Sequence, residues 1–368
     1  MNKQKILFLL QLPPPIHGAS VVNKSIQDSF LINNALNARF VNISPAKDLS
    51  DIGKLSIGKL FTFFRIYLSA ISAFFQLKPN LVYLTLSPHG LAFYKDGLIA
   101  ITMKLLGGKL VFHLHGKGIR KETSKSWLKK NLYRWVFNKV DIIHLAESLF
   151  PDVEDIRDHS KSIIAIANGV DPIDETNFSP KDEIFTFIYL SNLKPSKGAD
   201  LIVRAATLIP AKYQSCFQVK IVGKPSVAAY LTEIERLVIK NPFGNIEILG
   251  PLYGLEKIKQ LTSSNVFILP TRFKNECFPL SILEAMASGL AVISTNEGAI
   301  PDIIETGVTG EIITDCTPEV LAQAMTKHIT DQNYSALCSK HSREQFNLKY
   351  TSKIFEEKLA STLQALAK

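Results

Sequence analysis

One stretch in the second half of the chain, residues 266–304, places two apolar runs on either side of a segment with helical periodicity. Residues 266–269 are all apolar and end at a proline, which is typical of a buried strand. Pro279 stands where a first helical residue would, and Gly289 is a suitable helix stop. Residues 291–294 form the second apolar run. The stretch therefore predicts a strand–helix–strand unit of a parallel sheet.

Two carboxylates, Glu276 and Glu284, lie near the start of this predicted helix with seven residues between them. The free N–H groups and the positive dipole end of a helix N-terminus are a ready site for phosphate. A carboxylate beside a phosphate would repel it unless the carboxylate bound hydroxyl groups, such as those of a sugar or a ribose. The pair therefore suggests a cradle for a nucleotide sugar. The alternative, that Glu276 offsets the helix dipole and Glu284 is a solvated surface residue, remains open.

Residues 275–304, NECFPLSILEAMASGLAVISTNEGAIPDII, resemble the signature of retaining glycosyltransferases of family 4, which have the GT-B fold and include enzymes of bacterial surface-glycan synthesis. The usual glycine after Phe278 is replaced here by Pro279, so we expect a local difference in the loop. The resemblance implies a nucleotide-diphospho-sugar donor, UDP- or GDP-linked, with no cofactor and no metal. It assigns donor binding to Glu276, Cys277, Phe278, Pro279, Leu280 and Glu284, and a catalytic role to Glu276.

A second motif contains Lys197 and Gly198 in the loop after an apolar strand. In the resembled family a lysine here and an arginine at the position of Asn192 contact the diphosphate. Because a bidentate arginine holds phosphate better than an asparagine does, either another base substitutes or donor binding is weaker. Arg272 and Lys274 are candidate substitutes. The resemblance assigns Lys197 to catalysis and Asn192, Lys197 and Gly198 to donor binding.

The first half of the chain begins with an apolar strand, residues 5–10, followed by a proline-rich turn and a helical period. The turn contains Gly18 and Ala19. In this strand–turn–helix order, a phosphate group can approach the backbone of the turn and the start of the helix. There is no G-x-G-x-x-G pattern, which disfavours a nicotinamide cofactor. The resemblance places Gly18 and Ala19 on the donor side of an interdomain cleft. An ordinary strand–helix turn is the alternative reading.

A later strand ends in His-Leu-His-Gly, which puts His115 at the carboxyl end of a parallel strand, where ligands bind in α/β sheets. The resemblance implies that His115 lies beside the transferred sugar and takes part in catalysis. His113 alternates with His115, so both are expected on one side of the sheet. A metal pair is disfavoured because no third ligand stands at a suitable spacing. Asp96 matches a weakly conserved acidic position of the resembled family. The alternative is that it is a solvated residue on a helix face.

The chain has 368 residues, enough for two domains, and both halves alternate strands with helices. This order predicts an α/β protein with two doubly wound Rossmann-like domains, which in the GT-B fold face each other across a cleft. We expect an acceptor-side domain over residues 1–172 and a donor-binding domain over 173–345. Residues 346–368 are expected to form a C-terminal helix that crosses back to the first domain.

The formal net charge is +9, which favours an anionic partner. Two stretches, residues 54–78 and 117–139, combine basic and aromatic residues, as amphipathic helices at an anionic membrane surface do. Core packing or a solvated helix face is the alternative for both, and nucleic acid is disfavoured. From residues 1–11 we expect no secretory signal, and from the lengths of the apolar runs no membrane-spanning helix. We expect a cytoplasmic protein, peripheral on the inner face of the plasma membrane.

Together these patterns predict a retaining hexosyltransferase of bacterial polysaccharide biosynthesis. It would move a sugar from a nucleotide-diphospho-sugar to a glycan or polyprenyl-diphosphate-linked acceptor, with His115, Glu276 and Lys197 at the reaction centre. Two alternatives are a nucleotide-sugar epimerase of the same fold and a non-catalytic partner in a membrane glycan-assembly complex.

Overall fold

The computed structural model describes residues 3–44 and 57–368, so Lys54, the first residue of one basic stretch, lies outside the described residues. The chain divides into two compact units. The first unit comprises Met1–Gly169 and Lys353–Lys368, and the second comprises Val170–Ser352. Each unit contains one six-stranded sheet in which all neighbouring strands are parallel. The expected α/β class with two doubly wound sheets is confirmed.

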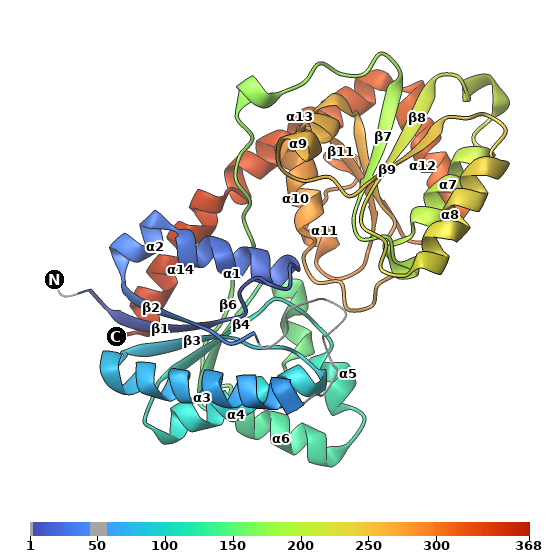
Figure 1. Cartoon of the computed structure of the whole chain (residues 1–368). Helices are drawn as coiled ribbons and strands as arrows, with labels where there is room; N and C mark the ends of the chain where they lie inside the picture. Colours follow the sequence, from blue (N-terminus) through green and yellow to red (C-terminus); the bar gives the residue numbers. More distant parts are fainter. Residues whose placement is uncertain (1–2, 45–56) are drawn as a thin grey trace. The chain divides into compact units, whose positions relative to one another are not determined.

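The sheet of the first unit has the strand order β2-β1-β3-β4-β5-β6 and is covered by helices on both faces (Figure 1). Its central strands are mostly apolar and are buried along almost their whole length, as expected for parallel strands covered on both faces. The strands are β1 (Lys5–Leu10), β2 (Asn37–Asn42), β3 (Leu81–Thr85), β4 (Leu110–Leu114), β5 (Val140–His144) and β6 (Ile163–Ala165).

Helices α3, α4 and α6 form one layer on this sheet, and α1, α2 and α14 lie on its other side (Figure 1). The first layer packs Ala70, Phe93 and Tyr133 against strand residues such as Phe112. The rings of Phe93 on α4 and Tyr133 on α6 are stacked with centroids 3.6 Å apart. The helices are α1 (Gly18–Asp28), α2 (Phe30–Ala35), α3 (Ile57–Leu77), α4 (Gly90–Leu105), α5 (Ile119–Thr123), α6 (Trp127–Phe137) and α14 (Ser352–Leu366).

The sheet of the second unit has the strand order β12-β11-β10-β7-β8-β9, so β7 and β10 are neighbours although two strands separate them in the chain. The strands are β7 (Phe185–Leu190), β8 (Phe217–Val222), β9 (Ile246–Gly250), β10 (Val266–Leu269), β11 (Ala291–Thr295) and β12 (Gly310–Ile313). The helices are α7 (Ala199–Leu208), α8 (Ala228–Lys240), α9 (Gly254–Ser263), α10 (Leu280–Ala287), α11 (Ile300–Ile303), α12 (Pro318–Thr330) and α13 (Gln332–Lys349).

Two local expectations need correction. Pro279 is the N-cap of α10 and not its first helical residue, because its ψ angle of 117° is extended. The helical period of residues 346–368 is divided between two helices, since α13 ends at Lys349 and α14 begins at Ser352. The break lets the backbone at Tyr350 and Ser352 hydrogen-bond to Val170 at 3.0 and 2.8 Å. Within the described ranges, no helix combines the length and hydropathy needed to cross a bilayer.

Candidate functional site

Two loops meet at the carboxyl edge of the second sheet, one after β7 and one after β10. The backbone N–H of Arg272 donates to the carbonyl of Ser196 at 2.7 Å. Gly198, which has a positive φ of 78°, lies so close to the second loop that a Cβ would come within 2.4 Å of the Pro270 carbonyl oxygen. Only glycine combines this backbone conformation with this approach. The two loops are therefore held together as one surface.

Lys197 and Glu276 form a salt bridge across these loops. Thr271 donates its hydroxyl to the same carboxylate oxygen, Oε2, at 3.0 Å. The side chain of Glu276 is only 8% exposed, so its charge depends on these partners. The three side chains form a preorganised charged site in which a diphosphate and Glu276 would compete for the ammonium group of Lys197.

The backbone after Glu276 is fixed by a third loop that contains Gly298. A Cβ on Gly298 would lie 2.4 Å from the Glu276 carbonyl oxygen, and the φ of this glycine is 63°. The N–H of Ala299 donates to the Cys277 carbonyl at 2.8 Å. Both Cys277 and Phe278 are buried. This arrangement holds the peptide groups between Glu276 and the start of α10 in a defined orientation.

Helix α10 begins at Leu280 directly after this segment, and its N-cap Pro279 has no polar side-chain group. The N–H of Ile282 donates to the Pro279 carbonyl at 3.1 Å. The two N–H groups before it, those of Leu280 and Ser281, are the ones that an anion could use. Glu284 lies one turn further along and is partly exposed, with Lys257 of α9 at 2.8 Å from its Oε1. Glu284 is thus a half-buried carboxylate with a cationic partner, and not a fully solvated residue.

The cation expected at the position of Asn192 is missing, and the substitutes named from the sequence are engaged elsewhere. Arg272 lies 3.7 Å from the carboxylate of Asp200 and donates to the Pro195 carbonyl at 3.1 Å. Lys274 is exposed and lies 2.7 Å from the carboxylate of Glu297. The charge of each base is therefore largely balanced by a carboxylate of the same unit.

Lys194 is a functional candidate that sequence reasoning missed. Its ammonium group lies 4.6 Å from the centroid of the Phe273 ring, and that of Lys197 lies 5.3 Å from the same centroid. No salt bridge joins Lys194 to a carboxylate within the described part of the chain. A ring shared by two ammonium groups places two positive charges beside each other. The available signal was the pair of lysines on either side of Pro195 and Ser196 in one loop.

The remaining candidates lie at the carboxyl edge of the sheet in the first unit. His115 directly follows β4, and Gly18 and Ala19 are the first residues of α1, whose N-cap is His17. The rings of His113 and His115 have centroids 4.0 Å apart, as expected from their alternation. Both ring nitrogens of His115 are shielded from solvent and have no hydrogen-bond partner in residues 3–44 and 57–368.

The histidines of this edge are held neutral by burial. Burial and the nearby His17 lower the pKa of His115 to about 3. Burial and then His115 lower the pKa of His144, at the end of β5, to about 3. Burial also lowers the pKa of His113, whose Nδ1 bonds to the Tyr83 hydroxyl. Of the described residues, no three His, Cys, Asp or Glu side chains are arranged to hold a metal ion.

Asp96, the other acidic candidate of the first unit, is fully buried and therefore not a solvated helix residue. Its Oδ2 accepts hydrogen bonds from Gln11 Nε2 at 3.2 Å and from the backbone N–H of Ser87 at 2.9 Å. Its Oδ1 lies 2.8 Å from Lys95 Nζ. These bonds join the loops after β1 and β3, so Asp96 orders this edge of the sheet.

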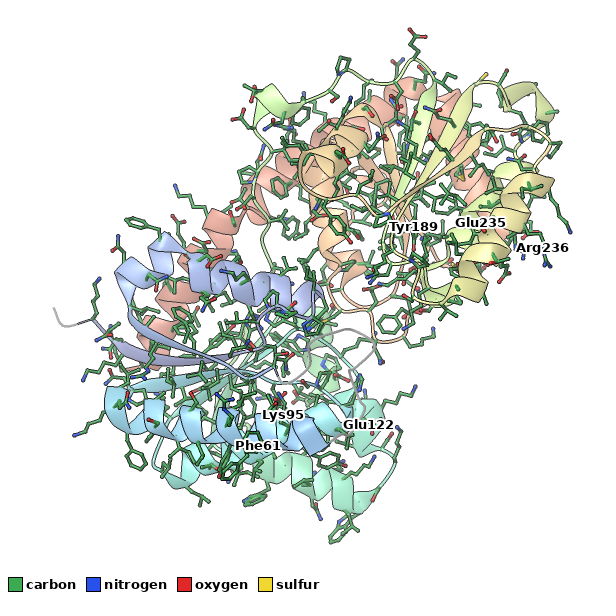
Figure 2. All side chains as sticks on the ribbon, viewed as in Figure 1. Phe61, Lys95, Glu122, Tyr189, Glu235 and Arg236 are labelled. Carbon is green, nitrogen blue, oxygen red and sulfur yellow. The ribbon has the colours of Figure 1, made fainter. Side chains whose placement is uncertain are left out.

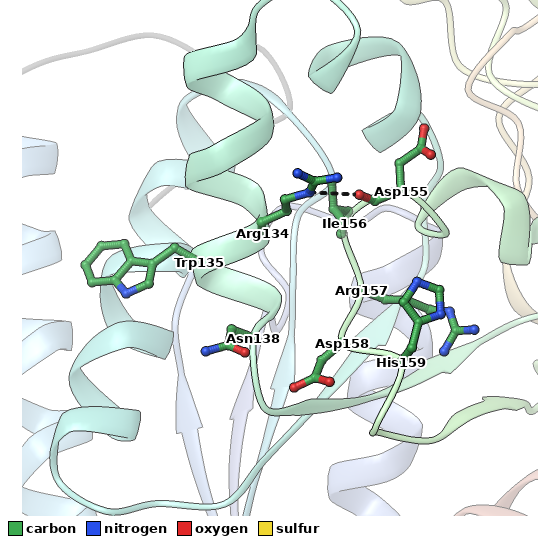
Figure 3. A pocket seen from close by; sticks show the side chains of 8 residues that line it. All are labelled: Arg134, Trp135, Asn138, Asp155, Ile156, Arg157, Asp158 and His159. Atoms are coloured by element: carbon green, nitrogen blue, oxygen red, sulfur yellow. Dashed lines mark hydrogen bonds between the residues drawn. The ribbon is translucent and has the colours of Figure 1, made fainter.

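An open pocket of about 560 Å³ lies elsewhere in the first unit, beside the C-terminus of α6 (Figure 3). Several of its polar lining residues already have hydrogen-bond partners within the first unit. Arg134 donates to the Asp155 carbonyl at 3.1 Å, and Asp158 accepts from the backbone N–H of Lys139 at 2.9 Å. Lys139 precedes β5, so the pocket lies at the amino edge of the sheet, opposite His115. It is separate from the candidate site.

Residues 172–345 match the family Glycosyl transferases group 1, which covers most of the second unit. The chain is 26% identical over 205 residues to the "Putative colanic acid biosynthesis glycosyltransferase WcaL" of Escherichia coli, a match that covers 53% of this chain and 50% of that protein. The chain spans about half the length of this relative.

Two solved structures share the fold over nearly the whole chain. A glycosyltransferase from Rickettsia africae superimposes with a TM-score of 0.79 at 16% identity and covers 100% of both chains. Anabaena HepE in complex with UDP superimposes with a TM-score of 0.74 at 18% identity and covers 98% of this chain and 100% of that one. The two sheets and their helices therefore have the GT-B fold.

Proposed function

We propose that this chain, whose residues 172–345 match the family Glycosyl transferases group 1, is a retaining hexosyltransferase of bacterial polysaccharide biosynthesis. It would move a sugar from a nucleotide-diphospho-sugar to a glycan or polyprenyl-diphosphate-linked acceptor. The observation that carries the proposal is the Lys197–Glu276 salt bridge beside the open N-terminus of α10. The UDP complex of HepE and the name of the colanic acid relative support the donor class and the pathway class.

In this proposal each donor group has a partner of matching chemistry. Glu284 accepts hydrogen bonds from the ribose hydroxyls, and Glu276 accepts them from the sugar hydroxyls. Backbone N–H groups near Cys277, Phe278 and Leu280 face the donor. Lys197 offsets the charge that develops on the leaving diphosphate, the electrostatic contribution that such reactions need most.

The transfer itself breaks the bond between the anomeric carbon and the diphosphate oxygen, and the bonding electrons leave with the phosphate. The acceptor oxygen bonds to the anomeric carbon on the same face, and its proton passes to the departing phosphate oxygen. No covalent intermediate is required. His115 is uncharged at neutral pH, because burial lowers its pKa to about 3, and it would contact the sugar as a neutral hydrogen-bonding group.

We assign to Lys194 the part of the missing arginine. Lys197 is already paired with Glu276, so much of its charge is compensated within the protein. The ammonium group of Lys194 lies 4.6 Å from the centroid of the Phe273 ring, which Lys197 also approaches. The side chain of Lys194 is exposed, so its charge is available to a diphosphate. Asn192 then contributes only a neutral donor.

We further propose that transfer needs no metal ion, since lysines and the α10 N-terminus supply the positive charge. Activity should survive an excess of EDTA. Complete loss in EDTA that is restored by magnesium or manganese, but not by calcium, would contradict this assignment.

A ligand screen tests the proposed function directly. UDP, GDP, ADP and their common sugar conjugates are compared in thermal unfolding. A nucleotide present at about 100 times its Kd adds roughly 2.7 kcal/mol to stability, which is an easily measured shift. We expect a UDP- or GDP-linked donor to stabilise the chain in this screen. In the cell, we propose that the protein works at the inner face of the plasma membrane. No shift with any nucleotide diphosphate would contradict the proposal.

A further inference from the structure

Helices α3 and α4 of the first unit each present a row of large apolar side chains to solvent. Each row has the same spacing, with steps of three, four and seven residues. At about 100° per residue these steps place every member of a row on one narrow helix face. On α3 the row is Phe61 (65% exposed), Phe64 (56%), Leu68 (49%) and Phe75 (58%); on α4 it is Leu91 (45%), Tyr94 (45%), Leu98 (46%) and Leu105 (80%).

Both rows point away from the sheet. On α3 the buried residues Ala70 and Phe74 occupy the opposite side of the helix, and on α4 Phe93 and Ala100 do so. Each helix therefore has two apolar faces, one in the core and one in solvent. A helix that is apolar on both sides is unusual at a surface exposed only to water.

The two rows lie on one continuous layer. The hydroxyls of Tyr67 on α3 and Thr102 on α4 are 2.7 Å apart. Lys104 of α4 donates to the Trp135 carbonyl of α6 at 2.7 Å. Helix α6 adds exposed Trp127 (72%), Leu128 (70%) and Trp135 (55%). The three helices run side by side in Figure 1, and Figure 2 labels Phe61 on α3. We call this surface the α3–α4–α6 face.

The charges on these helices are almost all positive. Their sequences contain a single carboxylate, Asp96, which is fully buried. Arg65 and Arg134 are exposed and lie on the same helices as the apolar residues. A second copy of the same face would bring like charges together, whereas an anionic surface would complement them. Aromatic residues with polar edges, such as Tyr94 and the tryptophans, are favoured where lipid meets water.

We propose that the α3–α4–α6 face docks on a bilayer that contains anionic lipids and inserts its apolar rows between the headgroups. The docking does not depend on the sugar-transfer chemistry of the second unit. It also differs from purely electrostatic attachment through Lys125, Lys129 and Lys130. Lys125 and Lys129 pair with Glu122, and Lys130 lies 3.9 Å from Asp155, so much of that charge is balanced. Buried apolar contacts persist at high salt, unlike surface charge attraction.

The chain offers its own reporter for this face, because both of its tryptophans, Trp127 and Trp135, lie on α6. The full chain is mixed with vesicles of phosphatidylcholine and phosphatidylglycerol whose acyl chains carry bromine. Insertion brings the indoles against the bromine atoms and quenches their fluorescence. We expect quenching with these vesicles, and much of it should remain at about 1 M salt, where the Debye length is only about 3 Å.

The test variant is Phe64→Ser/Leu98→Ser, which interrupts both rows at solvent-exposed positions. The matched control is Ile239→Ser/Leu348→Ser in the second unit, whose side chains are 83% and 75% exposed. The test variant should partition onto the vesicles at least about tenfold more weakly, and the control should match the wild type. Thermal unfolding and UDP or GDP binding are measured on all three proteins, so that a folding defect is recognised.

Several outcomes would overturn the proposal. Unquenched tryptophans with brominated vesicles would do so, and so would quenching that the test variant retains in full. Complete release of the protein from the vesicles at high salt would show that it is held by charge attraction alone. A dimer in sedimentation velocity that Phe64→Ser/Leu98→Ser dissolves would assign the face to a second copy. Nucleotide binding is read separately, so failure of docking and failure of the proposed function give different results.

Discussion

Lys197 forms a salt bridge with Glu276, a residue 79 positions later in the chain, at the carboxyl edge of the second sheet. Both side chains are mostly buried, with 17% and 8% of their surfaces exposed. A buried pair of this kind is costly to break from one side, because the remaining charge loses its partner. The same two groups are the proposed binding partners of the diphosphate and the sugar, so stability and donor binding depend on one contact.

The first prediction separates these two roles. Lys197→Met and Glu276→Gln should each lower the free energy of unfolding by about 3 kcal/mol, because each leaves a buried polar group without its charged partner. The double variant Lys197→Met/Glu276→Gln should recover part of that stability but no activity. Urea unfolding and initial transfer rates are measured together, with exposed Lys327→Met as the control. Activity in the double variant close to that of the wild type would show that the pair is only structural.

The second prediction concerns Lys194 and the ring beneath it. Lys194→Ala should raise the Kd for UDP or GDP by roughly tenfold and flatten its salt dependence, since a charged contact to phosphate is worth about 1.5–3 kcal/mol. Binding of the corresponding monophosphate should change less. The matched control is Lys212→Ala, because Lys212 lies 4.7 Å from the Tyr213 ring in the same unit but outside the loops at the carboxyl edge. Equal Kd values for the two variants would exclude Lys194 from the diphosphate site.

The third prediction concerns Glu284. Glu284→Ala should weaken nucleotide diphosphate binding by about 1.5–3 kcal/mol if its carboxylate holds the ribose hydroxyls. The loss should disappear with a 2′,3′-dideoxy nucleotide, which offers no hydroxyl to either protein. Calorimetry of the wild type and of Glu284→Ala, each with the natural and with the dideoxy nucleotide, gives the four binding free energies of a thermodynamic cycle. The control is Glu256→Ala, a change at an exposed position on α9. If Glu284→Ala weakens the dideoxy nucleotide as much as the natural one, the carboxylate does not contact the ribose.

The fourth prediction follows from the buried histidines of the first unit. The pKa of His115 and of His144 is lowered to about 3 in the folded chain, below the ordinary value of about 6.5. Between about pH 3 and pH 6.5, the two histidines therefore bind protons in the unfolded chain but not in the folded chain. The stability contributed by the neutral rings is complete above about pH 6.5 and is lost as the pH falls towards 3, by roughly 1.4 kcal/mol per histidine and pH unit.

Urea unfolding at several pH values below neutrality checks this sign and slope. His144→Asn should flatten the pH dependence, because asparagine can accept the Leu145 N–H that His144 Nδ1 accepts and has no proton to take up. Exposed His159→Asn is the control and should leave the slope unchanged. Stability that rises on acidification would contradict the assignment of neutral buried rings.

The strand–helix–strand units were predictable because their apolar runs are local. Val266–Leu269 and Ala291–Thr295 are strands as expected, and His115 follows a buried strand as its sequence pattern indicates. The Lys197–Glu276 pair was not predictable as a contact. It depends on β7 and β10 being neighbours in the sheet, and this order follows from packing of the whole unit and not from any local pattern.

The surface of the first unit was harder to predict for a related reason. Phe61 and Phe74 both fit an amphipathic helix, yet one is 65% exposed and the other is 9% exposed. Helical periodicity identifies a face but not what covers it, and the second apolar face of α3 and α4 is revealed only by their packing. The role of Lys194 was hidden in the same way, because the ring that it shares with Lys197 belongs to a loop nearly eighty residues away.

The most direct test of the central claim is release of nucleoside diphosphate from UDP- and GDP-sugars in the presence of a bacterial lipid extract, compared between the wild type and Glu276→Gln. The wild type should release the diphosphate and label the lipid or glycan fraction with the sugar. Glu276→Gln should do so at least about a hundredfold more slowly, as for other losses of a group that stabilises the transition state. No release with any donor, or equal rates for both proteins, would contradict the account.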